Sequence, residues 1–447
     1  MRMESNGSLQ VGSVQKLRSP LSSALLNAGV NSPEVYHVVL TGGPGGGKST
    51  ALSIITEKLS ALGYKVFAVP EVATLLHNGG ASFRPEMSTQ QLLSFEASVM
   101  KAQIALEDSF LEVARASGTP CVVLSDRGTM DVQAYMSSHD WELMLNVEQW
   151  RTAALRERYT AVFHLVTAAI GAEEHYTTAN NEARRESPQQ ARELDHATRA
   201  CWLGHPRLKI FENLEGEDFM GKIMRVVEAM LGVVGLPTPA EQERRFLVSL
   251  DHGRKAMELA TWRSSESGKK LCFEEFETVI HFLKPVTDET GALLSPRLMQ
   301  RSNKGVQTYH YSLKKDLPQD SGEPGLFQIV MAQMITGKEY VQMLSLRDPK
   351  HRVIKKRMRC FLHKTVYFTL NHYLGSNDTA EFFLLEAEDR SQRPACELLP
   401  SQLHDGGFVE VTANTAYTSF GCSQRSEDEW NPYDIPPADV ASCKSDS

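Results

Sequence analysis

The 447-residue sequence lacks the features that mark several classes of protein. Its seven cysteines are scattered and form no Cys-x-x-Cys pair, which argues against a zinc site and against a disulfide framework. No apolar run approaches the roughly 20 residues that span a bilayer. Basic residues are also few: 47 Lys and Arg stand against 55 Asp and Glu, and the formal charge of −8 argues against general nucleic-acid binding. The sequence therefore predicts a reduced, cytoplasmic protein that would contact membranes only peripherally.

The length and composition predict a globular chain of two or three domains. Residues 1–34 are rich in serine and predict a disordered leader, although a targeting peptide would look similar. From 35 to 231, short apolar runs alternate with amphipathic stretches, which is typical of βαβ units and a mostly parallel sheet. Residues 232–240 hold two glycines and two prolines and predict a linker. Strand-like alternation follows in 241–422, and the polar, acidic segment 423–447 predicts a disordered tail.

Five apolar runs are the candidate strands of the first domain. They are Val35–Thr41, Lys65–Val69, Cys121–Asp126, Thr160–Val166 and Leu208–Phe211. In the second domain, the strand-like stretches are longer and include Phe273–Leu283, Val353–Leu362 and Thr365–Tyr373. We therefore expect a parallel α/β sheet followed by an antiparallel, β-rich domain.

The most informative motif is G-G-P-G-G-G-K-S at residues 42–49, which has the complete GxxxxGK[ST] pattern of a phosphate-binding P-loop. An apolar run precedes it and a stretch with helical spacing follows it, as a P-loop requires. Lys48 would reach the β- and γ-phosphates, and the Ser49 hydroxyl would ligate Mg²⁺. A glycine-rich turn that binds nothing is the alternative. We predict a nucleoside-triphosphate site formed by Gly42, Gly43, Pro44, Gly45, Gly46, Gly47, Lys48, Ser49 and Thr50.

Acidic and basic residues that follow the neighbouring strands are the candidate catalytic groups. Asp126 ends an apolar strand in a Walker-B arrangement and would hold the metal, with Arg127 directly after it. Asp131 and Tyr135 have i, i+4 spacing and would share one face of the helix that follows. Glu71 ends another strand, and the sequence leaves it open as a general base or as a helix N-cap acid.

A polar segment before a predicted helix contains Arg184 and Arg185. A mobile basic segment at this place could close over the phosphates and neutralise transition-state charge. A solvated, charged helix face is the alternative.

The order of motifs in the first domain resembles one group of P-loop proteins. After the P-loop come P-E-V-A-T at 70–74, D-R-G-x-x-D-x-x-A-Y at 126–135, H-L-V-T-A-A at 164–169 and W-x-G-H-P at 202–206. This order is similar to the group that joins the kinase domain of the bacterial nicotinamide-nucleotide regulator with the insect TRPL-translocation-defect protein.

The resemblance implies a kinase-like core, a lid around 180–185, and a nucleotide base near Asn213. Insect-type members are described as GTP binders that act in membrane traffic. The sequence contains no Asn-Lys-x-Asp guanine signature, so it leaves ATP and GTP open.

Residues 241–245 read E-x-E-x-R, which places Glu241, Glu243 and Arg245 on one face of a strand. This resembles the ExExK signature of the CYTH, or triphosphate-tunnel, superfamily, with Arg in place of Lys. The resemblance implies an antiparallel β-barrel whose lumen holds divalent metal and polyphosphate. The anion would be bound by Arg245, Arg297, Arg301, Lys355, Arg357 and Arg359, and a metal by Glu241, Glu243, Glu386 and Glu388.

Asn371 stands where relatives of that superfamily carry an acid, which favours binding of a headgroup over hydrolysis. The insect-type domain is reported to bind phosphoinositide or phosphatidic acid. A solvated basic strand face at a sheet edge is the alternative.

Taken together, the sequence predicts an α/β P-loop domain followed by a CYTH-like β-barrel (α+β). We interpret the chain as a regulatory protein that binds ATP or GTP with Mg²⁺ and an anionic phosphate ligand such as a phosphoinositide or phosphatidic acid. Two alternatives stay open. One is a small-molecule kinase acting on a nucleoside or a molecule like nicotinamide riboside, and the other is a metal-dependent triphosphatase in the barrel.

Overall fold

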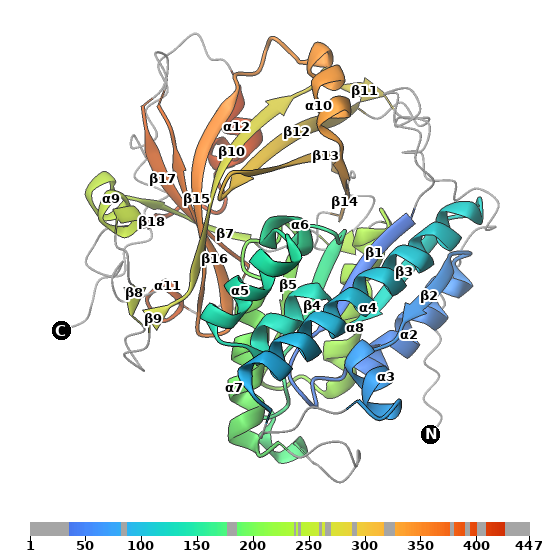
Figure 1. The fold of residues 1–447 in the computed structure, drawn as a ribbon. Coiled ribbons are helices and arrows are strands. Elements are labelled where there is room, and N and C mark those ends of the chain that lie inside the picture. The colour runs from blue at the N-terminus through green and yellow to red at the C-terminus, as the bar shows by residue number, and fades with distance from the viewer. Residues whose placement is uncertain are drawn as a thin grey trace, which may run out of the picture.

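The computed structural model describes residues 35–81, 87–176, 186–236, 238–239, 243–258, 262–263, 270–287, 293–316, 327–375, 380–388, 394–399 and 408–424. Two large sheets dominate it, one parallel and one antiparallel (Figure 1). None of the described helices is long and apolar enough to cross a membrane. The predicted leader, the segment with Arg184 and Arg185, Glu241, and the tail beyond 424 lie outside the described residues.

The first domain is a five-stranded parallel sheet in the order β2-β3-β1-β4-β5. Its buried strands read as nearly continuous apolar runs because helices cover both faces. All five predicted strands are confirmed to within a residue at either end. They are β1 (Val35–Thr41), β2 (Lys65–Val69), β3 (Cys121–Asp126), β4 (Ala161–Leu165) and β5 (Leu208–Phe211).

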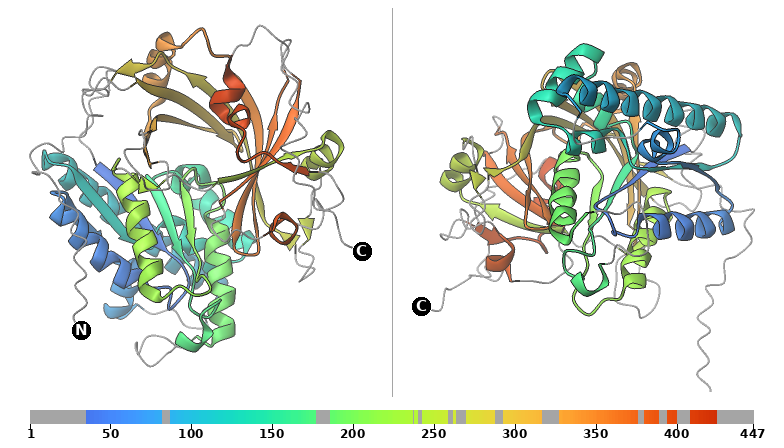
Figure 2. Two further views of the ribbon diagram at one scale, coloured as in Figure 1. Left: turned by 180° about the vertical axis from the view of Figure 1, so that it is seen from behind. Right: turned by 60° about the horizontal axis from the view of Figure 1, so that its bottom comes forward.

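The helices of this domain form two layers. Helices α2 (Lys48–Ala61) and α8 (Phe219–Val233) pack side by side on the face that carries Val38 and Leu40 (Figure 2). On the other face, α4 (Thr89–Ala116) and α5 (Ser138–Glu148) share a core with Val39. The shorter elements are α3 (Val72–Asn78), α6 (Thr152–Arg156), the 3₁₀ helices η2 (Thr129–Tyr135) and η3 (Glu173–His175), and α7 (Pro188–Cys201).

The second domain is built on an antiparallel sheet in the order β18-β7-β17-β16-β15-β10-β12-β13-β14-β6. The antiparallel fold is confirmed, but the closed barrel is not: among the described residues, end strand β18 pairs only with β7, and end strand β6 only with β14. The main strands are β7 (Glu243–Val248), β10 (Phe273–Phe282), β12 (Leu293–Asn303), β13 (Val306–Asp316), β14 (Phe327–Ile335), β15 (Ile354–His363), β16 (Val366–Tyr373) and β17 (Phe382–Glu388).

Shorter elements complete the second domain and its connection to the first. The strands are β6 (Thr238–Pro239), β8 (Trp262–Arg263), β9 (Lys270–Leu271), β11 (Val286–Thr287) and β18 (Phe408–Glu410). The helices are α9 (Leu250–Glu258), α10 (Gly337–Met343), η4 (Leu344–Leu346), α11 (Ala395–Leu398), η6 (Thr415–Tyr417) and α12 (Ser419–Ser423). The predicted linker is partly structured, because α8 extends to Val233 and β6 pairs with β14.

Buried charges join the two domains. Arg301 of β12 donates from Nη1 to Glu157 Oε1 at 2.9 Å and from Nη2 to the Gly204 carbonyl oxygen at 2.7 Å. His310 of β13 lies 3.0 Å from Glu157 Oε2. Glu157 and Arg301 are each only 3% exposed. Arg301 is therefore engaged by the first domain and does not present its charge to a ligand of the sheet.

Candidate nucleotide-binding site

The P-loop connects β1 to α2, and glycine is required at its start. A β-carbon on Gly42 would stand 2.1 Å from the Leu165 carbonyl oxygen of β4, a distance no side chain can adopt. Gly47 takes the left-handed conformation at φ 95° and forms the N-cap of α2. The loop thus lies against the end of β4, and the first N–H groups of α2 remain available for an anion.

Lys48 folds back onto the P-loop. Its Nζ donates to the carbonyl oxygens of Gly42 and Gly43, at 3.1 Å each. Burial and the nearby charge of Arg127 lower the pKa of Lys48 to about 8. Bound phosphate would offer Lys48 a stronger, charge-assisted acceptor than these carbonyls. The side chains of Ser49 and Thr50 are exposed at the start of α2, where a metal or phosphate could reach their hydroxyls.

Asp126 ends β3 beside the P-loop, as the sequence predicts. Its Oδ1 atom is buried and makes no hydrogen bond with any described group. Burial raises the pKa of Asp126, and the charge of Lys48 opposes that shift. A buried carboxylate oxygen without a donor is suited to the water shell of a divalent cation. Ser49 and Asp126 therefore fit the predicted Mg²⁺ site.

Glu71 and Arg127 form an ion pair that reaches the P-loop. Arg127 Nε donates to Glu71 Oε1 at 3.2 Å, and Arg127 Nη1 donates to the Gly42 carbonyl oxygen at 2.9 Å. Glu71 occupies the N-cap position of α3, yet its side chain accepts from the Thr74 hydroxyl rather than from a backbone N–H. Burial alone would raise the pKa of Glu71, but Arg127 and Thr74 lower it.

Asp131 has a structural role in this arrangement. Its Oδ1 accepts from the Thr41 hydroxyl and from Trp202 Nε1, and its Oδ2 accepts from the Gly128 N–H at 2.8 Å. The prediction that Asp131 and Tyr135 share a helix face is wrong, because Asp131 is buried and Tyr135 is 46% exposed. The segment is the 3₁₀ helix η2, in which residues four apart do not align.

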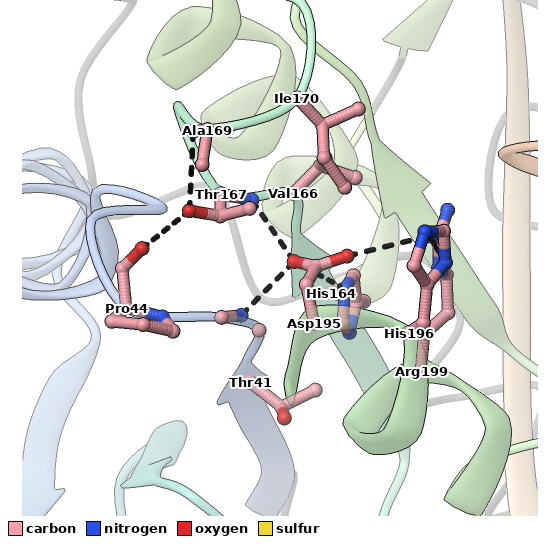
Figure 3. A network of polar contacts seen from close by, with 12 residues as sticks. Thr41, Pro44, His164, Val166, Thr167, Ala169, Ile170, Asp195, His196 and Arg199 are labelled. Atoms are coloured by element: carbon pink, nitrogen blue, oxygen red, sulfur yellow. Dashed lines mark hydrogen bonds and ion pairs between the residues drawn. The ribbon is translucent and has the colours of Figure 1, made fainter. Parts of the chain in front are cut away.

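A buried carboxylate that the sequence did not single out, Asp195 of α7, joins that helix to the P-loop (Figure 3). Its Oδ1 accepts from the backbone N–H of Gly43 at 3.1 Å and from that of Thr167 at 2.9 Å. Its Oδ2 pairs with Arg199 at 3.3 Å. In the sequence, this i, i+4 pair looks like an ordinary surface ion pair, so no local pattern reveals its burial.

The second buried group beside Asp195 is His164 of β4. Its Nε2 lies 3.2 Å from Asp195 Oδ1. Burial would raise the pKa of Asp195, but His164 and Arg199 hold it below its usual range. Burial lowers the pKa of His164, and the negative charge of Asp195 opposes that shift. Helix α7 begins with a capping box, Ser187 with Gln190, directly after the segment that the sequence predicts as a lid.

The amide of Asn213 is used within the protein. Its Nδ2 donates to the carbonyl oxygens of Thr167 and Ile170, at 2.9 and 2.6 Å. Its Oδ1 accepts from Lys222 Nζ at 2.9 Å, and burial lowers the pKa of that lysine to about 7. Asn213 therefore fixes the loop after β4, and its predicted place near the base stays a prediction.

The sheet of the second domain carries a separate group of ionisable residues. Strand register places six of them on one side of the sheet, which we call the charged face: Glu243, Arg245, Arg297, Lys356, Glu386 and Glu388. Burial lowers the pKa of Arg297, and the negative charges of Glu243 and Glu386 oppose that shift.

Lys355, Arg357 and Arg359 share one side of β15, as predicted, but it is the opposite side of the sheet from Arg245 and Arg297. Lys355 and Arg357 are exposed there. Arg359 pairs with Glu275 at 2.7 Å and donates to the carbonyl oxygens of Ala256 and Met257 at the end of α9. The three residues cannot join the predicted anion site on the charged face.

Lys356 takes their place on the charged face, and the sequence prediction missed it. It is 6% exposed, and its ammonium group lies over the Tyr373 ring, 5.2 Å from the ring centroid. Burial lowers its pKa, while Glu386 opposes the shift. Alternation along β15 was the available signal, since only every second residue can face the same side.

A cavity of about 210 Å³ lies where the charged face meets the first domain. Tyr159, His205 and Lys209 line it from the first domain, and Arg297 and His310 from the sheet.

Asn371, which replaces the acid expected from the CYTH resemblance, donates to Glu386 Oε2 at 2.7 Å. No three His, Cys, Asp or Glu side chains gather as a metal cluster among the described residues, which do not include Glu241.

The fold and the loop define a P-loop nucleotide-binding domain. Residues 37–214 match the family model described as AAA domain, which covers the P-loop, Asp126, Asp195 and Asn213. No curated protein sequence matches the chain. The match supports nucleotide binding by the first domain and does not extend to the antiparallel sheet.

Proposed function

We propose that this protein is a regulatory nucleotide-binding protein that takes ATP or GTP at the P-loop and a phosphate-bearing anion at the charged face. The observation that favours a regulatory protein over a kinase is the ion pair between Glu71 and Arg127. The P-loop is complete, yet the candidate general base is paired with Arg127, and that pairing lowers its pKa. A base with a lowered pKa is poorly suited to remove a proton from an acceptor hydroxyl.

Magnesium accompanies the nucleotide in this proposal. Ser49 and Asp126 would hold it, and the ion would neutralise part of the phosphate charge. Lys48 and the N–H groups at the start of α2 would bind the phosphates directly. Arg127 lies beside the loop through its bond to the Gly42 carbonyl oxygen and would add positive charge near the γ-phosphate. The predicted roles of Arg184 and Arg185 as a lid stay part of the proposal.

The anion site of the second domain rests on three groups that lie on the same side of the sheet. Arg297 donates from its Nε to Ser312 Oγ at 2.7 Å, and Lys356 is buried. Asn371 donates to Glu386 Oε2 at 2.7 Å. Two cations on one face, one buried and one partly buried, favour a ligand with several phosphate charges. A phosphoinositide or phosphatidic acid headgroup and a soluble polyphosphate share this chemistry.

The test of the nucleotide site is binding and turnover of ATP and GTP, each with Mg²⁺, in the wild type and two lysine variants. Lys48→Ala removes a charged contact to phosphate and should weaken binding about 10- to 100-fold. Lys58→Ala changes an exposed lysine in the last turn of the same helix and should leave binding unchanged. Binding of neither nucleotide by the wild type would overturn the proposal.

Turnover separates regulation from the two enzymatic alternatives. The proposal expects slow hydrolysis and no phosphorylated product with a panel of nucleoside acceptors, including nicotinamide riboside. A phosphate ester that is lost in Glu71→Gln, with ATP binding retained, would instead make the protein a kinase. Phosphate release from inorganic triphosphate that survives Lys48→Ala but not a combined Glu241→Ala and Glu243→Ala variant would make the second domain a triphosphatase.

A further inference from the structure

The exposed ring of Phe219 lies directly against the P-loop. Phe219 is the first residue of α8, and its side chain is 48% exposed. A β-carbon on Gly47 would stand 2.7 Å from Phe219 Cε2 and 3.0 Å from its Cζ, so the ring occupies the space beside that glycine. Ile223, one turn further along α8, is buried and approaches the same glycine. An accessible aromatic surface therefore adjoins the residue that precedes Lys48.

The order of strands decides which end of a nucleotide reaches this ring. In the sheet, β3 lies on one side of β1, and β4 and β5 lie on the other. Asp126 ends β3, so the metal and the γ-phosphate belong on that side. The ribose and base must then extend the opposite way, across the start of α2. Helix α8 follows β5 and packs beside α2, which puts Phe219 on the base side.

The segment that carries Phe219 is held firmly in place. Arg225 donates to both carboxylate oxygens of Glu217 and to the carbonyl oxygen of Glu212, at 2.6 Å for the last contact. Asp218 caps α8 by accepting from the backbone N–H of Gly221 at 2.7 Å. Because these contacts fix the first turn of α8, the ring position needs little reorganisation on binding.

We propose that Phe219 is the platform on which the base of the bound nucleotide stacks. This inference rests on the proposed nucleotide binding and adds the residue that recognises the base. The amide of Asn213 is occupied by backbone carbonyls and by Lys222, whereas the ring of Phe219 is 48% exposed and accessible to a ligand. Every base has a π-face, and stacking on an aromatic ring tolerates different bases. Phe219 thus contributes affinity for nucleotides and none for a ligand that lacks a base.

The experiment compares ligands with and without a base on the full chain. Binding of MgATP, MgGTP and magnesium tripolyphosphate is measured by calorimetry for the wild type, Phe219→Ala, Phe219→Trp and Met220→Ala. Met220 is the adjacent residue of α8 and is 44% exposed, which makes it a matched control. Loss of stacking should weaken nucleotide binding about 5- to 100-fold in Phe219→Ala. Tripolyphosphate binding should not change, and Phe219→Trp should retain nucleotide affinity.

The outcomes distinguish failure of the stacking role of Phe219 from failure of the proposed nucleotide binding. An equal loss of nucleotide and tripolyphosphate binding in Phe219→Ala would mean that the ring only supports Gly47, and it would overturn the stacking role. Unchanged nucleotide affinity in Phe219→Ala, or an equal loss in Met220→Ala, would overturn it as well. If the wild type binds neither nucleotide, the proposed function fails, and the inference fails with it.

Discussion

At the residue scale, the buried charge of Asp195 leads to a stability prediction. Asp195→Asn keeps an acceptor for the N–H groups of Gly43 and Thr167 but leaves Arg199 buried without its counter-charge. Breaking a buried ion pair in this way costs about 3 kcal/mol. We expect the free energy of unfolding, measured with urea, to fall by about that amount. Since Asp195 holds the P-loop, nucleotide affinity should fall as well.

The pH dependence of stability gives a second readout of the same substitution. The pKa of Asp195 is lowered below its normal value of 3.8 in the folded protein. Its contribution to stability is therefore present above pH 4 and is lost as the pH falls below that value. In Asp195→Asn, the free energy of unfolding should therefore fall less steeply than in the wild type as the pH drops below 4. An unchanged curve would contradict the ion pair, and partial recovery of stability on adding Arg199→Met would support it.

Single residues also show why part of the site could be predicted from the sequence. The P-loop is contiguous, so residues 42–49 identify it without any knowledge of the fold. Asp126 follows from the apolar strand before it. Asp195 and Phe219 depend on how distant elements pack, since α7 and α8 reach the P-loop only in three dimensions. No spacing within either helix carries that information.

At the element scale, strand β15 leads to a prediction about the anion site. Its odd-numbered basic residues face away from the charged face, whereas Lys356 lies on it. We expect Lys356→Met to weaken binding of a soluble inositol polyphosphate at least about tenfold, because a buried cation is lost from the site. Lys355→Met changes the neighbouring, exposed residue and should leave binding unchanged. Equal effects of both variants would contradict the assignment of the charged face.

Vesicles distinguish the source of the anion. Vesicles with phosphatidylinositol phosphate or phosphatidic acid are compared with phosphatidylcholine vesicles in a co-sedimentation assay, in parallel with the soluble ligand. Sedimentation that depends on Lys356 would support a lipid headgroup. Binding of the soluble polyphosphate alone would assign the site to a free anion.

The same strand shows what sequence alternation can and cannot predict. The sequence correctly grouped Lys355, Arg357 and Arg359 on one side, because alternation is a local property of extended chain. It did not indicate which side faced Arg297, since that depends on the pairing of β15 with β10 and of β10 with β12. The antiparallel fold could be predicted, but the open sheet could not, because closure depends on the pairing of the end strands.

At the scale of the whole molecule, Glu157 connects the two domains. Burial alone would raise the pKa of Glu157, but the hydrogen bond from His310 and the charge of Arg301 lower it to about 2. The stabilisation it provides is therefore present above its normal pKa of 4.5 and is lost as the pH falls toward 2. Between those values, Glu157 stays ionised in the folded protein but is protonated in the unfolded chain, so the free energy of unfolding falls while the ion pair persists.

Glu157→Gln tests whether this junction makes the two domains unfold together. The substitution leaves Arg301 buried without its charge partner, so we expect a loss of about 3 kcal/mol. In calorimetry, the wild type should unfold in one transition and the variant in two, with bound nucleotide stabilising only one of them. Glu148→Gln removes the more exposed ion pair with Lys101 and should cost at most about 1 kcal/mol. A single transition in Glu157→Gln, shifted no more than in Glu148→Gln, would mean that the apolar contact of Phe276 with Gly204 joins the domains instead.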